Sequence, residues 1–300
     1  MSDQVRIVEV GPRDGLQNEK TPVSAEARIA FIENLVKAGL HTIEVGSFVS
    51  PKAIPQMVNS DQVLRAVDHH PGYEFHVLVP NEKGYEAAKA AGAKVIAVFA
   101  SASEGFSKAN INCTVAESIQ RFVPVIERAR ADGIRVRGYV SCVLGCPYDG
   151  EVKPSAVVDV TKKLWDLGCY EVSLGDTIGV GTPSKARQLL RAVAAEVPMR
   201  NHGMHFHDTY GQALANLYAG LEEGARVIDS AAGGLGGCPY APGATGNVAT
   251  EDVVYMLEGM GVATGVDMKQ LVAATNDIAK VLGKSPVSRV ASALNAKARG

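Results

Sequence analysis

Eight short, mostly apolar runs recur along the chain, and segments with helical spacing separate them. The runs are VRIVEV (5–10), HTIEVGSF (41–48), YEFHVLVP (73–80), AKVIAVFAS (93–101), IRVRGYVSC (134–142), YEVSLGDT (170–177), GMHFHDT (203–209) and ARVIDSAAG (225–233). Several are apolar on both faces, which is typical of parallel strands covered by helices. Eight strands alternating with helices predict a (β/α)8 TIM barrel. The alternative is an open doubly wound sheet, but GPRDGLQ (11–17) lacks the glycine-rich pattern that usually follows its first strand.

Helix-start signals support this alternation. Ser24 precedes an amphipathic stretch over 25–39, and Thr114 with Glu117 matches a capping box. Pro183, after a possible Thr182 cap, suits the first turn of another helix. We expect one catalytic domain over 1–300, with the barrel at about 5–265 and a helical extension at about 266–300.

Composition excludes several classes of protein. The chain is 46% hydrophobic and 21% charged, with a formal net charge of -2, as in ordinary globular proteins. It has no basic run for nucleic acid and no apolar segment of membrane-spanning length. The first residues, MSDQVRIVEVGP, lack the pattern of a signal peptide. Five cysteines are an odd and sparse set, so we expect free thiols and a cytoplasmic location.

Polar side chains collect where the expected strands end, which is where TIM barrels place their functional groups. These residues are Arg13 and Asp14, Glu44 and Ser47, Asp176, His205 and His207, and, in the loop after the eighth strand, Cys238 and Asn247.

The pair His205 and His207 is the sharpest signal among them. Residues two apart on a strand point to the same face, so both imidazoles can reach one point. With a carboxylate from the first strand and an amide oxygen from the last loop, they offer donors suited to Mg²⁺ or Mn²⁺. The alternative is a pair of histidines that only fills the barrel.

Each remaining residue has a structural and a functional interpretation. Arg13 could pair with Asp14, or could neutralise a developing enolate or carboxylate oxygen beside a metal. Glu44 could position that arginine or simply fill the barrel, and Asp176 could cap a turn or handle a proton. Cys238 lies in AGGLGGCPYAPGATGN (232–247). So many glycines favour a closing loop that delivers a thiol, although a lone cysteine often only packs.

Longer motifs carry a resemblance to a known family. VGPRDGLQNE, SFVSPK, YVSCVLGCPYDG, SLGDTIGVGTP, HFHDTYGQALAN and GLGGCPYAPGATGNVATEDVVYMLEG are found in this chain. Over about 5–265 it resembles the 3-hydroxy-3-methylglutaryl-CoA (HMG-CoA) lyases, which belong to a larger group of metal-dependent barrels. The opening RDG and the H-x-H pair occur across that group, whereas the glycine and cysteine loop is more specific to the lyases.

The resemblance implies a role for each residue. Asp14, His205, His207 and Asn247 match the metal ligands, Arg13 the enolate-stabilising arginine, Cys238 the catalytic cysteine, Asp176 and Glu44 supporting acids, and Gln17 and Ser47 nearby polar positions. The implied reaction cleaves HMG-CoA to acetyl-CoA and acetoacetate, with Mg²⁺ or Mn²⁺ as cofactor.

Some expectations follow from the substrate and the group. Coenzyme A must cross the barrel mouth, where GFSKANIN (105–112), including Asn110, offers polar donors. A homodimer and a place in leucine breakdown are further expectations. The alternatives are a related aldolase or Claisen-type synthase acting on a 2-oxo or hydroxy acid, and a barrel that binds metal without catalysis.

Overall fold

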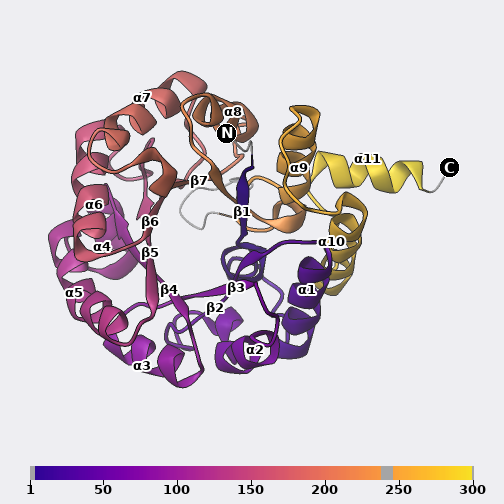
Figure 1. The fold of residues 1–300 in the computed structure, drawn as a ribbon, viewed down its shortest axis with the longest axis horizontal. Coiled ribbons are helices and arrows are strands. Elements are labelled where there is room, and N and C mark those ends of the chain that lie inside the picture. The colour runs from indigo at the N-terminus through magenta and orange to yellow at the C-terminus, as the bar shows by residue number, and fades with distance from the viewer. Residues whose placement is uncertain (1–3, 238–245, 299–300) are drawn as a thin grey trace.

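The structure is a computed structural model that describes residues 4–237 and 246–298. Within these residues, eight parallel strands form a closed barrel in sequence order, and the first strand pairs with the eighth. Figure 1 shows the strands at the centre and the helices in a ring around them. The predicted (β/α)8 barrel is therefore confirmed.

The strands are β1 (Arg6–Glu9), β2 (Thr42–Ser47), β3 (Glu74–Leu78), β4 (Val95–Ser101), β5 (Arg135–Ser141), β6 (Glu171–Asp176), β7 (His202–Phe206) and β8 (Val227–Ser230). The helices are α1 (Ala25–Lys37), α2 (Ser60–Val67), α3 (Glu82–Ala90), α4 (Glu104–Ile111), α5 (Val115–Ala131), α6 (Pro154–Leu167), α7 (Pro183–Ala194), α8 (Ala213–Glu222), α9 (Thr250–Gly259), α10 (Met268–Leu282) and α11 (Arg289–Lys297). Short helical turns are η1 (Gly11–Gly15), η2 (Pro55–Met57), η3 (Met199–Asn201) and η4 (Ala232–Gly234).

The structure confirms two of the predicted helix caps and corrects a third. The Ser24 hydroxyl accepts the backbone N–H of Ala27, and Thr114 with Glu117 forms the full capping box. Thr182 occupies the position before α7, but its side chain makes no capping hydrogen bond. Pro183 favours that start, because its fixed φ suits a first helical turn and it has no N–H of its own to satisfy.

The hydrophobic side chains of the described residues form one large core and two small clusters, one of which is Phe106, Cys142 and Cys146. The larger core lies between the strands and the surrounding helices, as expected when a sheet is covered on its outer face. The other small cluster, Leu78, Ala97 and Tyr139, lies apart from the large core, with Phe99 packed alongside. Between β2 and β3 the register shifts from Glu44 to Gly46. Such bulges redirect side chains beside active sites, and Glu44 here is fully buried.

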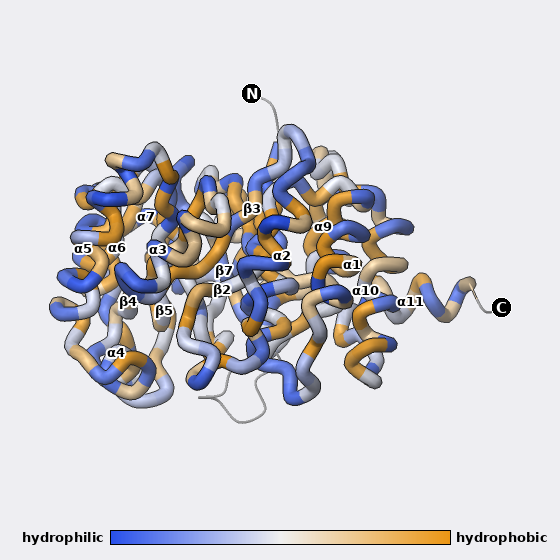
Figure 2. Tube along the Cα trace, turned by 90° about the horizontal axis from the view of Figure 1, so that it is seen from below, coloured by the Kyte–Doolittle hydropathy of each residue, from blue (hydrophilic) through white to orange (hydrophobic). Residues whose placement is uncertain are grey.

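The extension after the barrel is helical, as predicted. Helix α10 packs against α1 and η4, and α11 packs against α9 and α10. Figure 2 shows α11 projecting from the side of the barrel. Among the described residues, none of the helices has both the length and the apolar character needed to cross a membrane.

Candidate active site

The site begins at η1, a π-helical turn directly after β1. The N–H of Gly15 donates to the Val10 carbonyl at 3.2 Å, which closes a wide turn. Gly15 is required because a Cβ there would lie 2.8 Å from the Leu235 side chain. Single wide turns of this kind occur frequently at functional sites. The turn places Arg13 and Asp14 at the barrel mouth instead of along a regular strand.

Arg13 is held between two carboxylates. Its Nε donates to Glu44 Oε2 at 2.7 Å, its Nη2 lies 2.6 Å from the same oxygen, and its Nη1 donates to Asp14 Oδ1 at 2.8 Å. Burial opposes the guanidinium charge, but Glu44 and Asp14 raise the pKa of Arg13 above its usual value. The cation is therefore fixed in place and charged at all physiological pH values.

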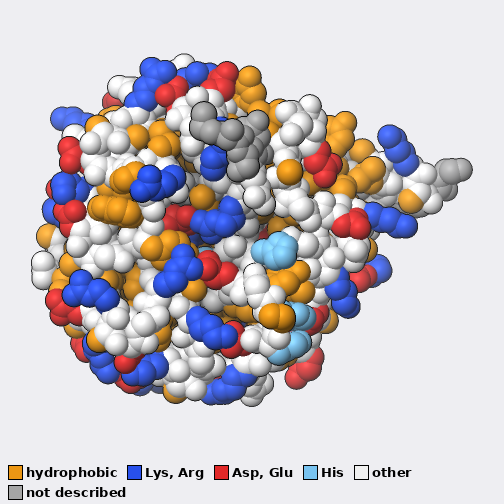
Figure 3. Space-filling model, in the orientation of Figure 1, with side chains coloured by type: hydrophobic (Ala, Val, Ile, Leu, Met, Phe, Trp, Pro, Cys, Tyr) orange, Lys and Arg blue, Asp and Glu red, His pale blue; other side chains and the backbone are white. Residues whose placement is uncertain are grey.

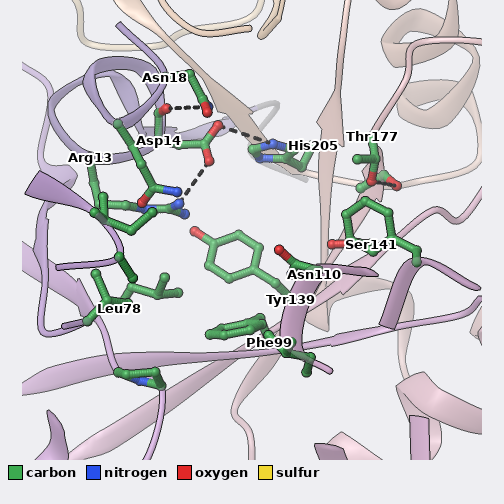
Figure 4. A pocket seen from close by; sticks show the side chains of 18 of the residues that line it. Arg13, Asp14, Asn18, Leu78, Phe99, Asn110, Tyr139, Ser141, Thr177 and His205 are labelled. Atoms are coloured by element: carbon green, nitrogen blue, oxygen red, sulfur yellow. Dashed lines mark hydrogen bonds and ion pairs between the residues drawn. The ribbon is translucent and has the colours of Figure 1, made fainter. Parts of the chain in front are cut away.

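Asp14, His205 and His207 form the candidate metal centre. Each offers one ligand atom, and the three atoms all lie within 4.8 Å of one another. Asp14 Oδ2 is 3.9 Å from His205 Nε2, and the two imidazole ring centres are 5.4 Å apart. Figure 4 shows Asp14 between Arg13 and His205. The predicted convergence of the first and seventh strands is thus observed.

The charges in this cluster suit a cation. Burial opposes ionisation of Asp14, yet Arg13 and the two imidazoles lower its pKa to about 2. Burial, with the neighbouring His205, lowers the pKa of His207 to about 4, so its lone pair is free at neutral pH. Asn247 Nδ2 donates to Asp14 Oδ2 at 2.8 Å, which brings the amide to the same point. One carboxylate, two imidazoles and an adjacent amide fit a divalent ion.

A second carboxylate supports His205 from inside the barrel. Asp229 Oδ2 accepts from His205 Nδ1 at 3.3 Å, and Arg137 donates to both Asp229 oxygens at 2.9 and 2.7 Å. Arg137 Nε also donates to Glu171 at 2.7 Å. Hydrogen bonds of this kind orient imidazole ligands in metal sites. Sequence reasoning missed this network.

A cavity of about 490 Å³ opens beside the cluster. Its wall includes Arg13, Asp14, His205 and His207 together with Gln17 and Asn110, which were both predicted from the sequence. Apolar side chains complete the wall, and they include Val49, Ile54, Leu78, Phe99 and Phe106. Gln17 Oε1 is buried and has no hydrogen-bond partner among the described residues. A buried amide oxygen without a partner points to a ligand group in the cavity.

Four of the predicted residues that the structure describes lie outside the cavity wall, namely Glu44 and Asn247, described above, and Asp176 and Ser47. Asp176 accepts the backbone N–H groups of Val180 and Gly181 at 3.2 and 2.8 Å, so it caps the turn after β6. Burial raises its pKa to about 6. Ser47 is buried at the end of β2, with its Oγ 3.5 Å from the Leu78 carbonyl. Cys238, the predicted catalytic thiol, lies outside the described residues.

Tyr139 is a further residue of this site that the sequence did not single out. Its hydroxyl accepts from Arg137 at 2.8 Å, and its ring lies 5.8 Å from the Arg13 guanidinium carbon. Tyr139 thus links the buried network to the barrel mouth, as Figure 4 shows for its ring beside Arg13 and Asn110. The signal available in the sequence was the i, i+2 spacing of Arg137 and Tyr139, which puts both on one face of β5.

The closed barrel and the cluster at its mouth define a (β/α)8 protein with a candidate divalent-metal site. The HMGL-like family model matches residues 4–278, so the chain belongs to the HMGL-like family. The resemblance found in the sequence is confirmed.

Individual relatives are similar over nearly the whole chain. The chain is 60% identical over 295 residues to the 3-hydroxy-3-isohexenylglutaryl-CoA/hydroxy-methylglutaryl-CoA lyase of Pseudomonas aeruginosa, with 98% of each protein covered. A crystal structure of hydroxymethylglutaryl-CoA lyase from that organism superposes with a TM-score of 0.97 at 59% identity, covering 99% of both chains. The structure of an HMG-CoA lyase from Acinetobacter baumannii, in complex with coenzyme A and 3-methylmalate, superposes with a TM-score of 0.93 at 36% identity, covering 98% of this chain and 96% of that one.

Proposed function

We propose that the chain is an HMG-CoA lyase that cleaves 3-hydroxy-3-methylglutaryl-CoA to acetyl-CoA and acetoacetate with the help of a divalent metal. The observation that carries this proposal is the meeting of Asp14, His205 and His207 beside the buried, charged Arg13. The near-full-length similarity to HMG-CoA lyases supports the same reaction.

Asp14, His205, His207 and Asn247 would hold Mg²⁺ or Mn²⁺. When bound, such an ion polarises the oxygens it touches and lowers the pKa of a coordinated hydroxyl. On the protein side, Asp14 supplies a carboxylate that Arg13 and the imidazoles keep ionised. Asp229 fixes the ring of His205 so that Nε2 faces Asp14.

Arg13 would stabilise the enolate oxygen of the acetyl-CoA fragment. Cleavage leaves the electron pair of the broken carbon–carbon bond on that fragment, and the charge is carried by the thioester oxygen. A fixed guanidinium stabilises such a charge without reorganising during the reaction. The two contacts that Arg13 makes to the Glu44 carboxylate hold the guanidinium in this position, so Glu44 acts as a positioning residue.

Two proton transfers complete the reaction. The substrate hydroxyl must lose a proton, for which Asp176, His205 and Cys238 are the candidates, and the enolate carbon must gain one. The carboxylate of Asp176 is engaged by backbone N–H groups outside the cavity wall. With Nε2 on the metal and Nδ1 donating to Asp229, His205 would have no free lone pair, which favours Cys238 as the group in contact with substrate. We assign protonation of the enolate carbon to Cys238.

The cavity suggests where the rest of the substrate binds. Gln17 and Asn110 would contact polar groups of the substrate, with Asn110 on the coenzyme A side. Ser47, buried at the end of β2, would support the mouth from behind the wall. The apolar wall also favours a second substrate, because one close relative is named for 3-hydroxy-3-isohexenylglutaryl-CoA as well. Comparing kcat/KM for the two thioesters tests this breadth.

Several finer features complete the proposal. We infer a single catalytic domain over 1–300, a cytoplasmic location, a homodimer and a place in leucine breakdown. Sedimentation in solution measures the oligomeric state.

A coupled assay for acetyl-CoA and acetoacetate tests the proposed reaction. With Mg²⁺ we expect turnover that stops with chelator and collapses in Cys238→Ser. If folded, metal-replete protein leaves HMG-CoA intact, the substrate assignment is wrong. Turnover of a hydroxy-oxo-acid instead would point to the aldolase alternative.

A further inference from the structure

A second group of potential metal ligands lies at the other end of the barrel. Glu33 on α1 meets His69 and His70, which follow α2, and their ligand atoms all lie within 4.8 Å of one another. This is the end where the strands start, because His70 packs beside Tyr73, which directly precedes β3, and Phe75, which lies near its beginning. Figure 3 shows histidine side chains at the surface between α1 and α2.

His69 is oriented as a metal ligand would be. Its Nδ1 lies 2.8 Å from the Ala66 carbonyl, to which it can only donate, so Nε2 carries the lone pair. That Nε2 is 4.0 Å from Glu33 Oε1. Metal-binding histidines usually donate their other ring nitrogen to a carbonyl or carboxylate in this way. The side chain is 64% exposed, so a hydrated ion can reach it.

His70 completes the group from a more buried position. Its Nε2 lies 3.0 Å from both oxygens of Glu33. Its ring centre is 4.1 Å from that of His69 and 5.7 Å from that of Tyr73, and its side chain is 21% exposed. Packing on both sides fixes the ring, so little side-chain entropy remains to be lost on binding an ion.

We propose that Glu33, His69 and His70 bind Zn²⁺. Two imidazoles and a carboxylate are a donor set that zinc uses, with a water in the fourth position. Mg²⁺ prefers oxygen ligands and octahedral geometry, so it does not compete well for such a set. The ion would join α1 to the end of α2 at the face opposite the barrel mouth, where it touches no substrate.

Zinc binding to variants tests this proposal. The full chain is titrated with Zn²⁺ by calorimetry in excess Mg²⁺, and the number of ions bound is compared with that of His70→Gln and Glu33→Gln. We expect each variant to bind one Zn²⁺ fewer than the unaltered chain. His41→Gln is the matched control, because His41 is exposed, stacks on Tyr73 near the group and is no part of it, and it should bind the full number.

The difference between variants isolates this site, since the barrel cluster could itself take up zinc in all of them. Urea unfolding of the unaltered chain and of each variant, measured in the presence of chelator, checks that every protein is folded. If His70→Gln and Glu33→Gln both fold and bind as many Zn²⁺ ions as the control, the proposal is wrong. That result would leave the proposed lyase reaction untouched, because neither residue lies at the barrel mouth.

Discussion

Replacing Asp229 with asparagine tests how the barrel interior supports the metal centre. The carboxylate is buried, and it accepts from His205, Ser173 and both terminal nitrogens of Arg137. Burial opposes its charge, but Arg137 and His205 hold its pKa below the usual range. The amide of the Asp229→Asn variant would offer only one oxygen and would place an N–H donor against another donor.

The expected effects follow from these contacts. Breaking a buried ion pair costs about 3 to 5 kcal/mol. We expect a cost at the lower end of this range, because Arg137 retains its 2.7 Å bond to the Glu171 carboxylate. A domain with about 5 to 15 kcal/mol of stability remains folded. Loss of the bond that orients His205 should weaken metal binding by about 10- to 100-fold, or about 1.4 to 2.7 kcal/mol.

Two measurements separate stability from metal binding. Urea unfolding of metal-free protein gives the first quantity, and Mn²⁺ titration by calorimetry gives the second. Ser173→Ala is the matched control, because it removes a 2.8 Å bond to the same oxygen but leaves the His205 contact. It should cost about 1 kcal/mol and bind Mn²⁺ normally. Equal Mn²⁺ affinity in folded Asp229→Asn and in the control would refute the supporting role.

Three further predictions concern other parts of the chain. Arg13→Lys loses the guanidinium that bonds to both Glu44 and Asp14, so kcat should fall about 100- to 1000-fold at saturating metal. A kcat within about threefold of wild type would contradict this. Burial raises the pKa of Glu9 from 4.5 to about 7, so the folded state holds a proton that the unfolded chain loses, and stability falls as pH rises between these values. Between pH 4.5 and pH 8, the free energy of unfolding of Glu9→Gln should therefore rise by about 3 kcal/mol relative to that of wild type. If urea unfolding shows the same difference between the two proteins at every pH, this prediction is wrong. Thr114→Ala, which removes the cap of α5, should cost about 1 kcal/mol, and an unchanged urea midpoint would count against it.

The fold could be predicted because one physical pattern repeats eight times. Each buried strand needs a helix to cover its outer face, and each helix needs a start, so periodicity and caps such as Ser24 and Thr114 agree. The predicted side-chain cap at Thr182 was wrong, because a proline favours a helix start without a capping hydrogen bond from the preceding side chain.

The barrel mouth was also predictable, because parallel strands bring their carboxyl ends together. Asp14, His205 and Asn247 are far apart in sequence and adjacent in space for that reason. The ion pairs beneath them were not predictable. Arg137 and Asp229 are 92 residues apart, and a charge within a strand gives no sign in the sequence of whether it faces solvent or the barrel interior. The group at Glu33 depends on the angle between two helices, which sequence periodicity does not determine.

The most direct test of the central claim compares wild type with Asp14→Asn in one assay of HMG-CoA cleavage. The substitution keeps the shape of the side chain but removes the charge that the cluster at the barrel mouth uses to hold a cation. We predict that wild type with Mg²⁺ releases acetyl-CoA and acetoacetate in equal amounts, and that folded Asp14→Asn releases neither at a comparable rate. Undiminished release of both products by Asp14→Asn, or by wild type in chelator, would contradict the assignment.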